Sequence, residues 1–381
     1  MKKPDAPTTL YISADDMVRL VRRKGLGACI QGVAKHIEAE FLRWEEFDKS
    51  ARVPSYSPNG VIELMPIADS RFFAFKCVNG HPTNTLIGLP TVMAFGFLAD
   101  VETGAPRLLS ELTLVTAIRT AAMSALVAQK LARPDSRVMA LIGNGAQSEF
   151  QALAFRDLVG IRELRLYDID PDATAKLLTN LAGQGLRLRP CASTGEAVHG
   201  ADIVTTITAA MTQANVLVPA MIEPGMHINA VGGDCPGKSE LHPGVVERSS
   251  VFCEFEPQTR IEGEIQQMPA GFPVVEFWQV LAGKHPGRKN AKDVTLFDSV
   301  GFALEDYAAL CFVREAALEL GIGEVMRLVP RLDNPKDLFG VLRGADTGHE
   351  APSRDHEHDG EEFVRSLTPV WKSSDSFARR V

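Results

Sequence analysis

The chain has 381 residues, of which 45% are hydrophobic, with a formal net charge of −8 and an isoelectric point near 5.7. This length is typical of two domains, each with enough apolar residues to bury a core. The acidic balance argues against nucleic acid or an anionic membrane surface as a partner. No run of about 18 apolar residues occurs, and Met1–Asp5 lacks an apolar segment after its lysines, so we expect neither membrane insertion nor export.

The cysteines favour a reducing compartment. They show no C-x-x-C pair and no metal-ligand spacing with histidines, which predicts free thiols in a cytoplasmic protein and no metal site. The six are Cys29, Cys77, Cys191, Cys235, Cys253 and Cys311.

The N-terminal third differs in pattern from the middle of the chain. Residues 9–49 are predicted to be helical, and 60–101 to be β-rich with Gly- and Pro-containing turns. The helical pattern of 304–321 follows much later. We expect an α+β domain of residues 1–130, completed by 304–343.

Three basic residues of this domain stand beside apolar sequence: Arg52, Lys76 and Arg119. Arg119 belongs to an Ala-rich helical pattern and is expected to face packed side chains. A guanidinium fork together with an ammonium suits the carboxylate of an amino acid. The alternative for each is a surface cation or a member of a structural ion pair.

The segment Val138–Ser148 is the clearest motif, because an apolar run ends in a Gly-x-Gly turn and then enters a helical pattern. Gly143 allows the tight turn, Gly145 removes a side chain that would block a pyrophosphate, and a helix from Ala146 presents free N–H groups to that anion. The third position of the pattern is Ser148, where Gly or Ala is commoner. A plain strand–turn–helix connection is the alternative.

A carboxylate stands at the position expected for ribose binding. Asp168 ends the apolar-alternating run 163–167, and an acid there accepts hydrogen bonds from the ribose hydroxyls and repels a 2′-phosphate. We therefore predict NAD as the cofactor. Asp168 could instead cap the helix that opens at Pro171, and the two roles are compatible.

Short apolar runs alternate with helical stretches from about 138 to 300, which is typical of βαβ units and predicts a Rossmann-type NAD-binding domain of residues 131–303. Helices are expected at 146–159 and 171–183. Polar residues dominate 344–381, which we predict to be a disordered tail. The expected strands are 138–142, 163–167, 186–190, 202–207, 226–231, 250–254 and 293–297.

A second motif, Asn229–Lys238, follows a strand of that domain and should lie at the carboxyl edge of its sheet, where ligands bind. Asp234 would then project toward the nicotinamide as a carboxylate able to hold an ammonium or take a proton. An Asp-x-Pro-Gly turn is the structural alternative. No histidine is placed beside Cys235, which favours a small apolar residue over a thiol nucleophile.

The chain resembles the ornithine cyclodeaminase and mu-crystallin family from about residue 9 to residue 340. The blocks that carry the resemblance are Phe47–Val53, Val61–Pro66, Ala74–Lys76, Val78–Pro82, Gly143–Phe150, Gly232–Lys238, Glu256–Glu264 and Phe297–Gly301. The chain departs from the family pattern at Leu86–Pro90 and in its tail. The resemblance implies a homodimer joined through the non-Rossmann domains, and a redox-neutral cyclisation of L-ornithine to L-proline with loss of ammonia.

Carried over by residue, the resemblance implies specific roles. It places the substrate carboxylate on Arg52, Lys76 and Arg119, with Val300 as a further substrate contact. It makes Asp234 the central catalytic acid and Glu63 a second acid. The implied cofactor residues are Thr91, Arg119, Gly143, Gly145, Ala146, Gln147, Asp168, Thr208, Ile228, Asn229, Ala230, Val231, Lys238 and Ser299.

Other functions stay open at this point. The same fold could serve an NAD(P)-dependent ketimine reductase or an amino-acid dehydrogenase with net cofactor turnover. The substrate could be another diamino acid, such as lysine or 2,4-diaminobutyrate. A non-catalytic binding protein is a third interpretation, against which the presence of Asp234 and all three cations argues.

Overall fold

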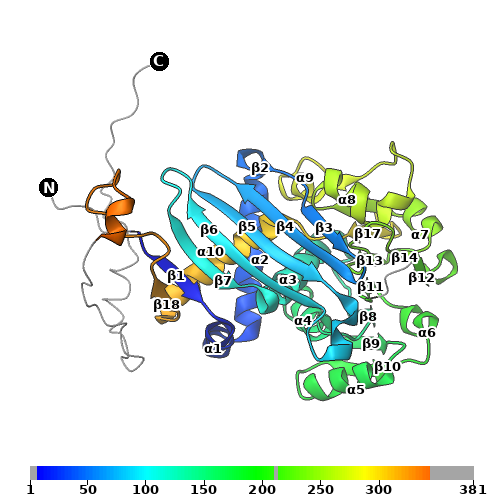
Figure 1. Cartoon of the computed structure of the whole chain (residues 1–381). Helices are drawn as coiled ribbons and strands as arrows, with labels where there is room; N and C mark the ends of the chain where they lie inside the picture. The colour runs from blue at the N-terminus through cyan, green and yellow to red at the C-terminus, as the bar shows by residue number, and fades with distance from the viewer. Residues whose placement is uncertain (1–6, 210–212, 344–381) are drawn as a thin grey trace.

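The structure, a computed structural model, describes residues 7–209 and 213–343. Two large β-sheets lie side by side, with helices packed against them (Figure 1). The predicted disordered tail, 344–381, and the N-terminal Met1–Asp5 lie outside the described residues.

The first sheet is mixed and is built mainly from the N-terminal third. Its strands follow the order β18-β1-β7-β6-β5-β4-β2, with β3 also paired to β4. The pair β1–β7 is parallel and the other pairs are antiparallel. The strands are β1 (Thr9–Ile12), β2 (Asp48–Lys49), β3 (Val53–Ser57), β4 (Gly60–Ala68), β5 (Phe72–Gly80), β6 (Val92–Asp100), β7 (Pro106–Glu111) and β18 (Glu324–Met326).

Alternation along β4 and β5 sends one set of side chains inward and the other outward. Glu63 pairs with Val78 and Met65 with Lys76, and all four are buried on the inner face. The outward face keeps large apolar side chains exposed: Ile62, Leu64, Phe73, Met93 and Phe95. Helices cover the other face, behind the sheet in the view of Figure 1.

Three helices form the layer under this sheet: α2 (Leu26–Leu42), α3 (Thr113–Leu131) and α10 (Ala303–Leu320), with α1 (Ala14–Lys24) beside them. α3 is the central element, because 15 of its 19 residues are buried. It contacts β6 of the first sheet and β13 and β17 of the second. The Ala-rich run Ala121–Ala128 lets neighbouring backbones approach closely.

The second sheet is entirely parallel. Its order is β10-β9-β8-β11-β13-β17-β15-β16, so the chain runs outward from β8 in one direction and then continues from β11 in the other. Such a reversal creates a crevice at the carboxyl edge of the strands, where nucleotides bind. The strands are β8 (Val138–Ile142), β9 (Glu163–Tyr167), β10 (Arg187–Pro190), β11 (Ile203–Thr206), β13 (His227–Ala230), β15 (Ser250–Cys253), β16 (Val275–Glu276) and β17 (Thr295–Asp298).

Short helices and one small strand pair complete this half of the molecule. The helices are α4 (Ser148–Ala154), α5 (Pro171–Asn180), α6 (Thr194–Val198), α7 (Pro243–Glu247), α8 (Glu256–Glu262) and α9 (Phe277–Leu281), and the separate strand pair is β12 (Gln213–Leu217) with β14 (Ser239–Leu241).

The α/β fold class is confirmed, and all seven expected strands of the parallel sheet occur within two residues of their predicted ends. The expectation of helix throughout 9–49 is wrong at its two ends, where β1 and β2 form. β1 is a strand because it pairs with β7 and β18, segments far away in the chain. The helix expected at 146–159 begins at Ser148 and turns π-helical over Phe155–Val159.

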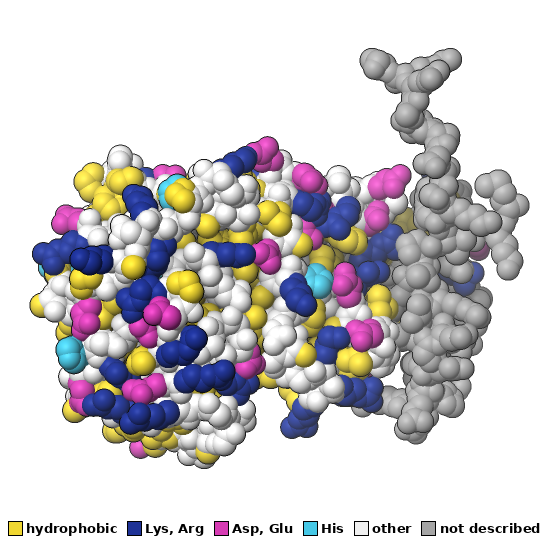
Figure 2. Space-filling view, turned by 180° about the vertical axis from the view of Figure 1, so that it is seen from behind, with side chains coloured by type: hydrophobic (Ala, Val, Ile, Leu, Met, Phe, Trp, Pro, Cys, Tyr) yellow, Lys and Arg dark blue, Asp and Glu magenta, His cyan; other side chains and the backbone are white. Residues whose placement is uncertain are grey.

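The face opposite that of Figure 1 carries basic and acidic side chains in an interspersed pattern (Figure 2). Among the described residues, Arg133 forms an ion pair with Asp202 and Arg165 with Glu163. Within the described part of the chain, no helix is long and apolar enough to cross a membrane.

Candidate functional site

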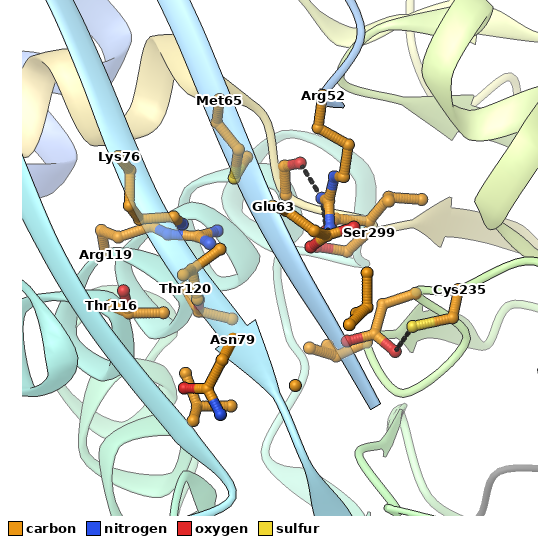
Figure 3. A pocket seen from close by; sticks show the side chains of 18 of the residues that line it. Arg52, Glu63, Met65, Lys76, Asn79, Thr116, Arg119, Thr120, Cys235 and Ser299 are labelled. Atoms are coloured by element: carbon orange, nitrogen blue, oxygen red, sulfur yellow. Dashed lines mark hydrogen bonds and ion pairs between the residues drawn. The ribbon is translucent and has the colours of Figure 1, made fainter. Parts of the chain in front are cut away.

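A pocket lies where the inner face of the first sheet meets the carboxyl edge of the second (Figure 3). β4 and β5 contribute Glu63 and Lys76, and α3 contributes Arg119. The loops after β13 and β17 contribute Asp234 and Val300. The pocket therefore combines charged groups from both halves of the molecule.

Arg52 lies at one side of the pocket, in the loop before β3. Its Nη1 is 2.9 Å from Glu63 Oε2 and its Nε is 3.0 Å from Glu262 Oε2. Its Nη2 donates to the carbonyls of Val300 and Gly301 at 2.8 and 2.7 Å. Burial and the charge of Glu63 contribute to raising the pKa of Glu262 to about 7, although Arg52 opposes that rise. These partners fix the orientation of the guanidinium before any ligand binds.

Lys76 and Arg119 lie deeper in the pocket and share one acid. Lys76 Nζ is 2.9 Å from the carboxylate of Asp306, which also lies 3.1 Å from Arg119 Nε. Arg119 Nη1 contacts Glu305 at 2.7 Å. Burial, and next the charge of Arg119, lower the pKa of Lys76 to about 8, while Asp306 opposes the shift. Two cations held beside each other form a site for a carboxylate.

Asp234 occupies the loop after β13, on the side of the pocket formed by the parallel sheet. Its Oδ1 is 2.9 Å from Lys238 Nζ and 3.7 Å from Cys235 Sγ. Burial, and next the charge of Asp234, raise the pKa of Cys235 to about 12. The thiol is thus held in its neutral form, in agreement with the expectation that Cys235 is no nucleophile.

The turn after β8 has the geometry expected of a phosphate loop. Gly143 has φ of +95°, and a Cβ there would lie 2.6 Å from the Ile207 carbonyl oxygen. A Cβ on Gly145 would meet no atom within 4 Å, so this glycine borders open space. The turn leads through Gln147 into α4, whose N-terminal N–H groups face the same edge of the sheet.

Asp168 follows β9 and is hydrogen-bonded to this loop. Its carboxylate accepts from Asn144 N at 2.6 Å and from Asp170 N at 2.9 Å. The cap of α5 is Asp170, which accepts from Asp172 N at 2.9 Å. The interpretation of Asp168 as the helix cap is therefore wrong, because another carboxylate does this.

Nine of the residues singled out from the sequence line the pocket together: Arg52, Glu63, Lys76, Arg119, Gln147, Val231, Asp234, Ser299 and Val300. The others lie outside it. Ile228, Asn229 and Ala230 are fully buried within β13, and Lys238 is held against Asp234. The remaining predicted contacts are Thr91, Gly143, Gly145, Ala146, Asp168 and Thr208.

Of the four acids that pair with the three cations, Glu63 was predicted as a site residue and the other three were not. Glu305 and Asp306 are buried at the start of α10, and Glu262 lies in α8. A signal was present, since two adjacent acids interrupt an otherwise apolar helical run, and buried carboxylates require partners. Which cations they meet depends on the packing of α10 against β5 and α3.

Among the residues that the structure describes, no group of histidine, cysteine or acidic side chains is placed to hold a metal ion. The fold and the pocket define a dinucleotide-binding α/β protein with a charged site for a small ligand. Residues 14–321 match the model of the ornithine cyclodeaminase/mu-crystallin family, and the chain belongs to this family.

Similar proteins match this chain over most of its length. An ornithine cyclodeaminase of Brucella melitensis biotype 1 is 53% identical over 342 residues, which is 90% of this chain and 95% of that protein. A solved lysine cyclodeaminase, described for its recognition of L-lysine, L-ornithine and L-2,4-diaminobutyric acid, superposes with a TM-score of 0.84 at 28% identity and covers 88% of this chain and 99% of its own. An archaeal alanine dehydrogenase dimer with bound NAD gives a TM-score of 0.76 at 28% identity, covering 84% and 100%.

Proposed function

We propose that this protein is an NAD-dependent cyclodeaminase that converts L-ornithine to L-proline and ammonia. The observation that carries the proposal is the pocket in which Arg52, Lys76 and Arg119 face Asp234 at the carboxyl edge of a nucleotide-binding sheet. The site thus offers cations for a carboxylate and an acid for an amine. The high identity to ornithine cyclodeaminases supports the same reaction.

The residues present fit NAD. Gly145 leaves room beside the N-terminus of α4 for a pyrophosphate, and Asp168 places a carboxylate where ribose hydroxyls would donate. When bound, NAD supplies a transient acceptor for the hydride of the substrate Cα and returns that hydride to the cyclised product, so there is no net oxidation.

Arg52, Lys76 and Arg119 would bind the α-carboxylate of the amino acid. Their acid partners restrain both guanidinium groups, so little side-chain entropy remains to be lost when the ligand binds. This arrangement places Cα and both amino groups toward the parallel sheet. Val300 lines the same side and limits the space around the side chain.

Asp234 would hold the δ-ammonium and accept its proton, because only the neutral amine is a nucleophile. Once the hydride has been removed from Cα, the δ-nitrogen would add to Cα, and the bond from Cα to the α-nitrogen would then break as that nitrogen takes a proton and leaves as ammonia. Folding the side chain back toward Cα raises the effective concentration of the amine. Glu63, on the opposite wall of the pocket, is the second acid available for proton transfer.

The protein is further proposed to act as a cytoplasmic homodimer, joined through the exposed apolar face of β4, β5 and β6. Phe75 stacks on Phe97 at 5.4 Å and meets Phe95 at 6.3 Å on this face, which leaves an aromatic surface that a second copy would cover. In this proposal residues 1–130 with 304–343 form the substrate and dimerisation domain, and 131–303 form the NAD-binding domain. All six cysteines are unpaired, which suits a reducing compartment.

The test is a stoichiometry measurement on the purified protein with L-ornithine and catalytic NAD. We expect equal amounts of proline and ammonia without accumulation of NADH, and ¹⁵N placed on the α-amine should leave entirely as ammonia. A ketimine reductase or an amino-acid dehydrogenase would instead consume or form one NADH per turnover. L-lysine and L-2,4-diaminobutyrate, supplied in place of L-ornithine, determine the specificity.

A further inference from the structure

A buried carboxyl group lies against a loop that lines the pocket. Glu254 follows β15 and is 1% exposed. Its Oε1 accepts from Ser299 Oγ at 3.0 Å and from Gly301 N at 3.1 Å, and its Oε2 accepts from Val300 N at 3.3 Å. One side chain therefore binds three consecutive residues of the Ser299–Gly301 loop.

The carbonyl groups of the same loop accept hydrogen bonds from two other side chains. Arg52 Nη2 donates to the carbonyls of Val300 and Gly301, and Gln258 Nε2 donates to Gly301 at 2.7 Å. Gln258 also accepts from the backbone N–H of Arg52 at 3.2 Å. The donors and acceptors of the loop thus connect Glu254 to Arg52.

We propose that Glu254 is a positioning residue for the amino-acid site, which sets the orientation of Arg52 by fixing the carbonyl groups to which Arg52 donates. Glu254 does not line the pocket and would touch neither substrate nor cofactor. The inference rests on the proposed function, because it assigns the effect of Glu254 to the binding of an α-carboxylate.

The conservative variant Glu254→Gln separates this role from simple structural support. Its amide group replaces one accepting oxygen by an NH₂ group, which can only donate. This group then faces an N–H or O–H donor of the Ser299–Gly301 loop, so one hydrogen bond that holds the loop is lost. A matched control exists at the opposite edge of the same sheet. Asp202 accepts from the backbone N–H groups of Arg137 and Val138 at 2.8 and 2.9 Å and also pairs with Arg133, so Asp202→Asn weakens another carboxylate anchor of the same sheet, which does not line the pocket.

For folded Glu254→Gln we expect KM for L-ornithine to rise about tenfold, which is the size expected when one hydrogen bond is lost. kcat should stay within about threefold, since Asp234 keeps its own contacts. Asp202→Asn should lower the thermal midpoint and leave KM unchanged. An unchanged KM in Glu254→Gln, or an equal rise in Asp202→Asn, overturns the inference.

Coupling to Arg52 gives a second test. If Glu254 acts through Arg52, KM of the double variant Glu254→Gln/Arg52→Lys should be close to that of Arg52→Lys alone, whereas multiplied effects would contradict the proposal. If Glu254→Gln does not fold, Gln258→Met is the substitute, because it removes the neighbouring hydrogen bond to Gly301 without changing the charge. An unchanged KM for L-ornithine in Gln258→Met would then contradict the inference. Wild-type protein that forms no proline contradicts the proposed function itself, while an active wild type with a normal Glu254→Gln contradicts this inference alone.

Discussion

Asp234 Oδ1 and Lys238 Nζ lie 2.9 Å apart within one loop, yet the aspartate side chain is 44% exposed and that of the lysine only 8%. The lysine therefore approaches from the buried side, and the carboxylate faces the pocket. Because Lys238 and Cys235 both contact Oδ1, the other oxygen can serve a substrate ammonium. The ion pair fixes the acid in place without covering it.

Replacing this acid tests the catalytic assignment. Asp234→Asn keeps the size of the side chain but removes the charge and the proton acceptor, so we expect turnover to fall at least ~100-fold. NAD affinity, followed by fluorescence or calorimetry, should be retained. Near-normal proline formation by this variant would show that the proton goes elsewhere.

We expect the cofactor preference to depend on Asp168. Asp168→Ser combined with Ile169→Arg removes a repulsive charge and adds a cation at a fully exposed position, so the preference should move from NAD toward NADP. The dissociation constants of both cofactors give the answer. Asp170→Ser is the matched control, because Ser still caps α5 and the preference should not change. If the cofactor preference of the double variant is unchanged, the role of Asp168 is structural, through its hydrogen bond with Asn144, and not cofactor selection.

Arg119 is a member of a structural ion pair, and in the proposed function it also binds the substrate carboxylate. Arg119→Lys keeps the charge but loses the planar fork that contacts Glu305 and Asp306, so we expect both a higher KM for L-ornithine, by roughly tenfold, and a lower thermal midpoint. If Arg119 bound only the substrate and had no acid partners, Arg119→Lys would leave the stability of the protein almost unchanged. Kinetics and thermal unfolding measured on one preparation separate the effects, and a destabilised variant with unaltered KM would remove Arg119 from the substrate site.

The pH dependence of substrate binding follows from Lys76. Burial and Arg119 lower its pKa to about 8, so the ammonium is present below pH 8 and is lost as the pH rises through this value. KM for L-ornithine should therefore increase above pH 8, by about tenfold per pH unit. In Lys76→Gln no ammonium exists at any pH. We expect KM for L-ornithine in Lys76→Gln to be high at every pH and to show no increase above pH 8. If KM of this variant still increases above pH 8, another group causes the increase.

Self-association can be tested on the open face of the first sheet. Phe95 is 46% exposed there, and Phe95→Asp would place a charge at the proposed interface. We expect the mass in solution to fall from twice 41.4 kDa to that of one chain. Leu42→Asp changes an equally exposed apolar residue at the end of α2 and should leave the dimer intact. A Phe95→Asp protein that remains dimeric would place the interface elsewhere.

The central strands of the parallel sheet could be predicted from the sequence because they are buried on both faces and are rich in apolar residues, as in Val138–Ile142. β1 could not be predicted, since its strand conformation depends on pairing with β7 about 100 residues later. The boundaries of the two domains stay a prediction, because α3 packs against strands of both sheets.

The candidate site, too, could be predicted only in part from the sequence. Arg52, Lys76 and Arg119 are marked in the sequence by charge beside apolar residues, and Asp234 by its glycine-rich loop. Their convergence and their acid partners depend on contacts between residues far apart in the chain, such as Lys76 with Asp306. Spacing along a sequence carries no information on such distances. The alternative role of Asp168 as the cap of α5 overlooked Asp170, which directly precedes Pro171 and is the residue that caps this helix.

Access to the pocket is constrained by α3. Many enzymes that bind nucleotides open and close by rotating one lobe against the other about a hinge. Here such a rotation would have to break the close packing of α3, whose small side chains contact both sheets. We therefore expect the two lobes to keep one orientation through the catalytic cycle while ligands enter and leave by movements of loops at the pocket rim. Amide hydrogen exchange should then show slow, ligand-independent exchange along Ala121–Ala128, with changes on NAD binding confined to the loops.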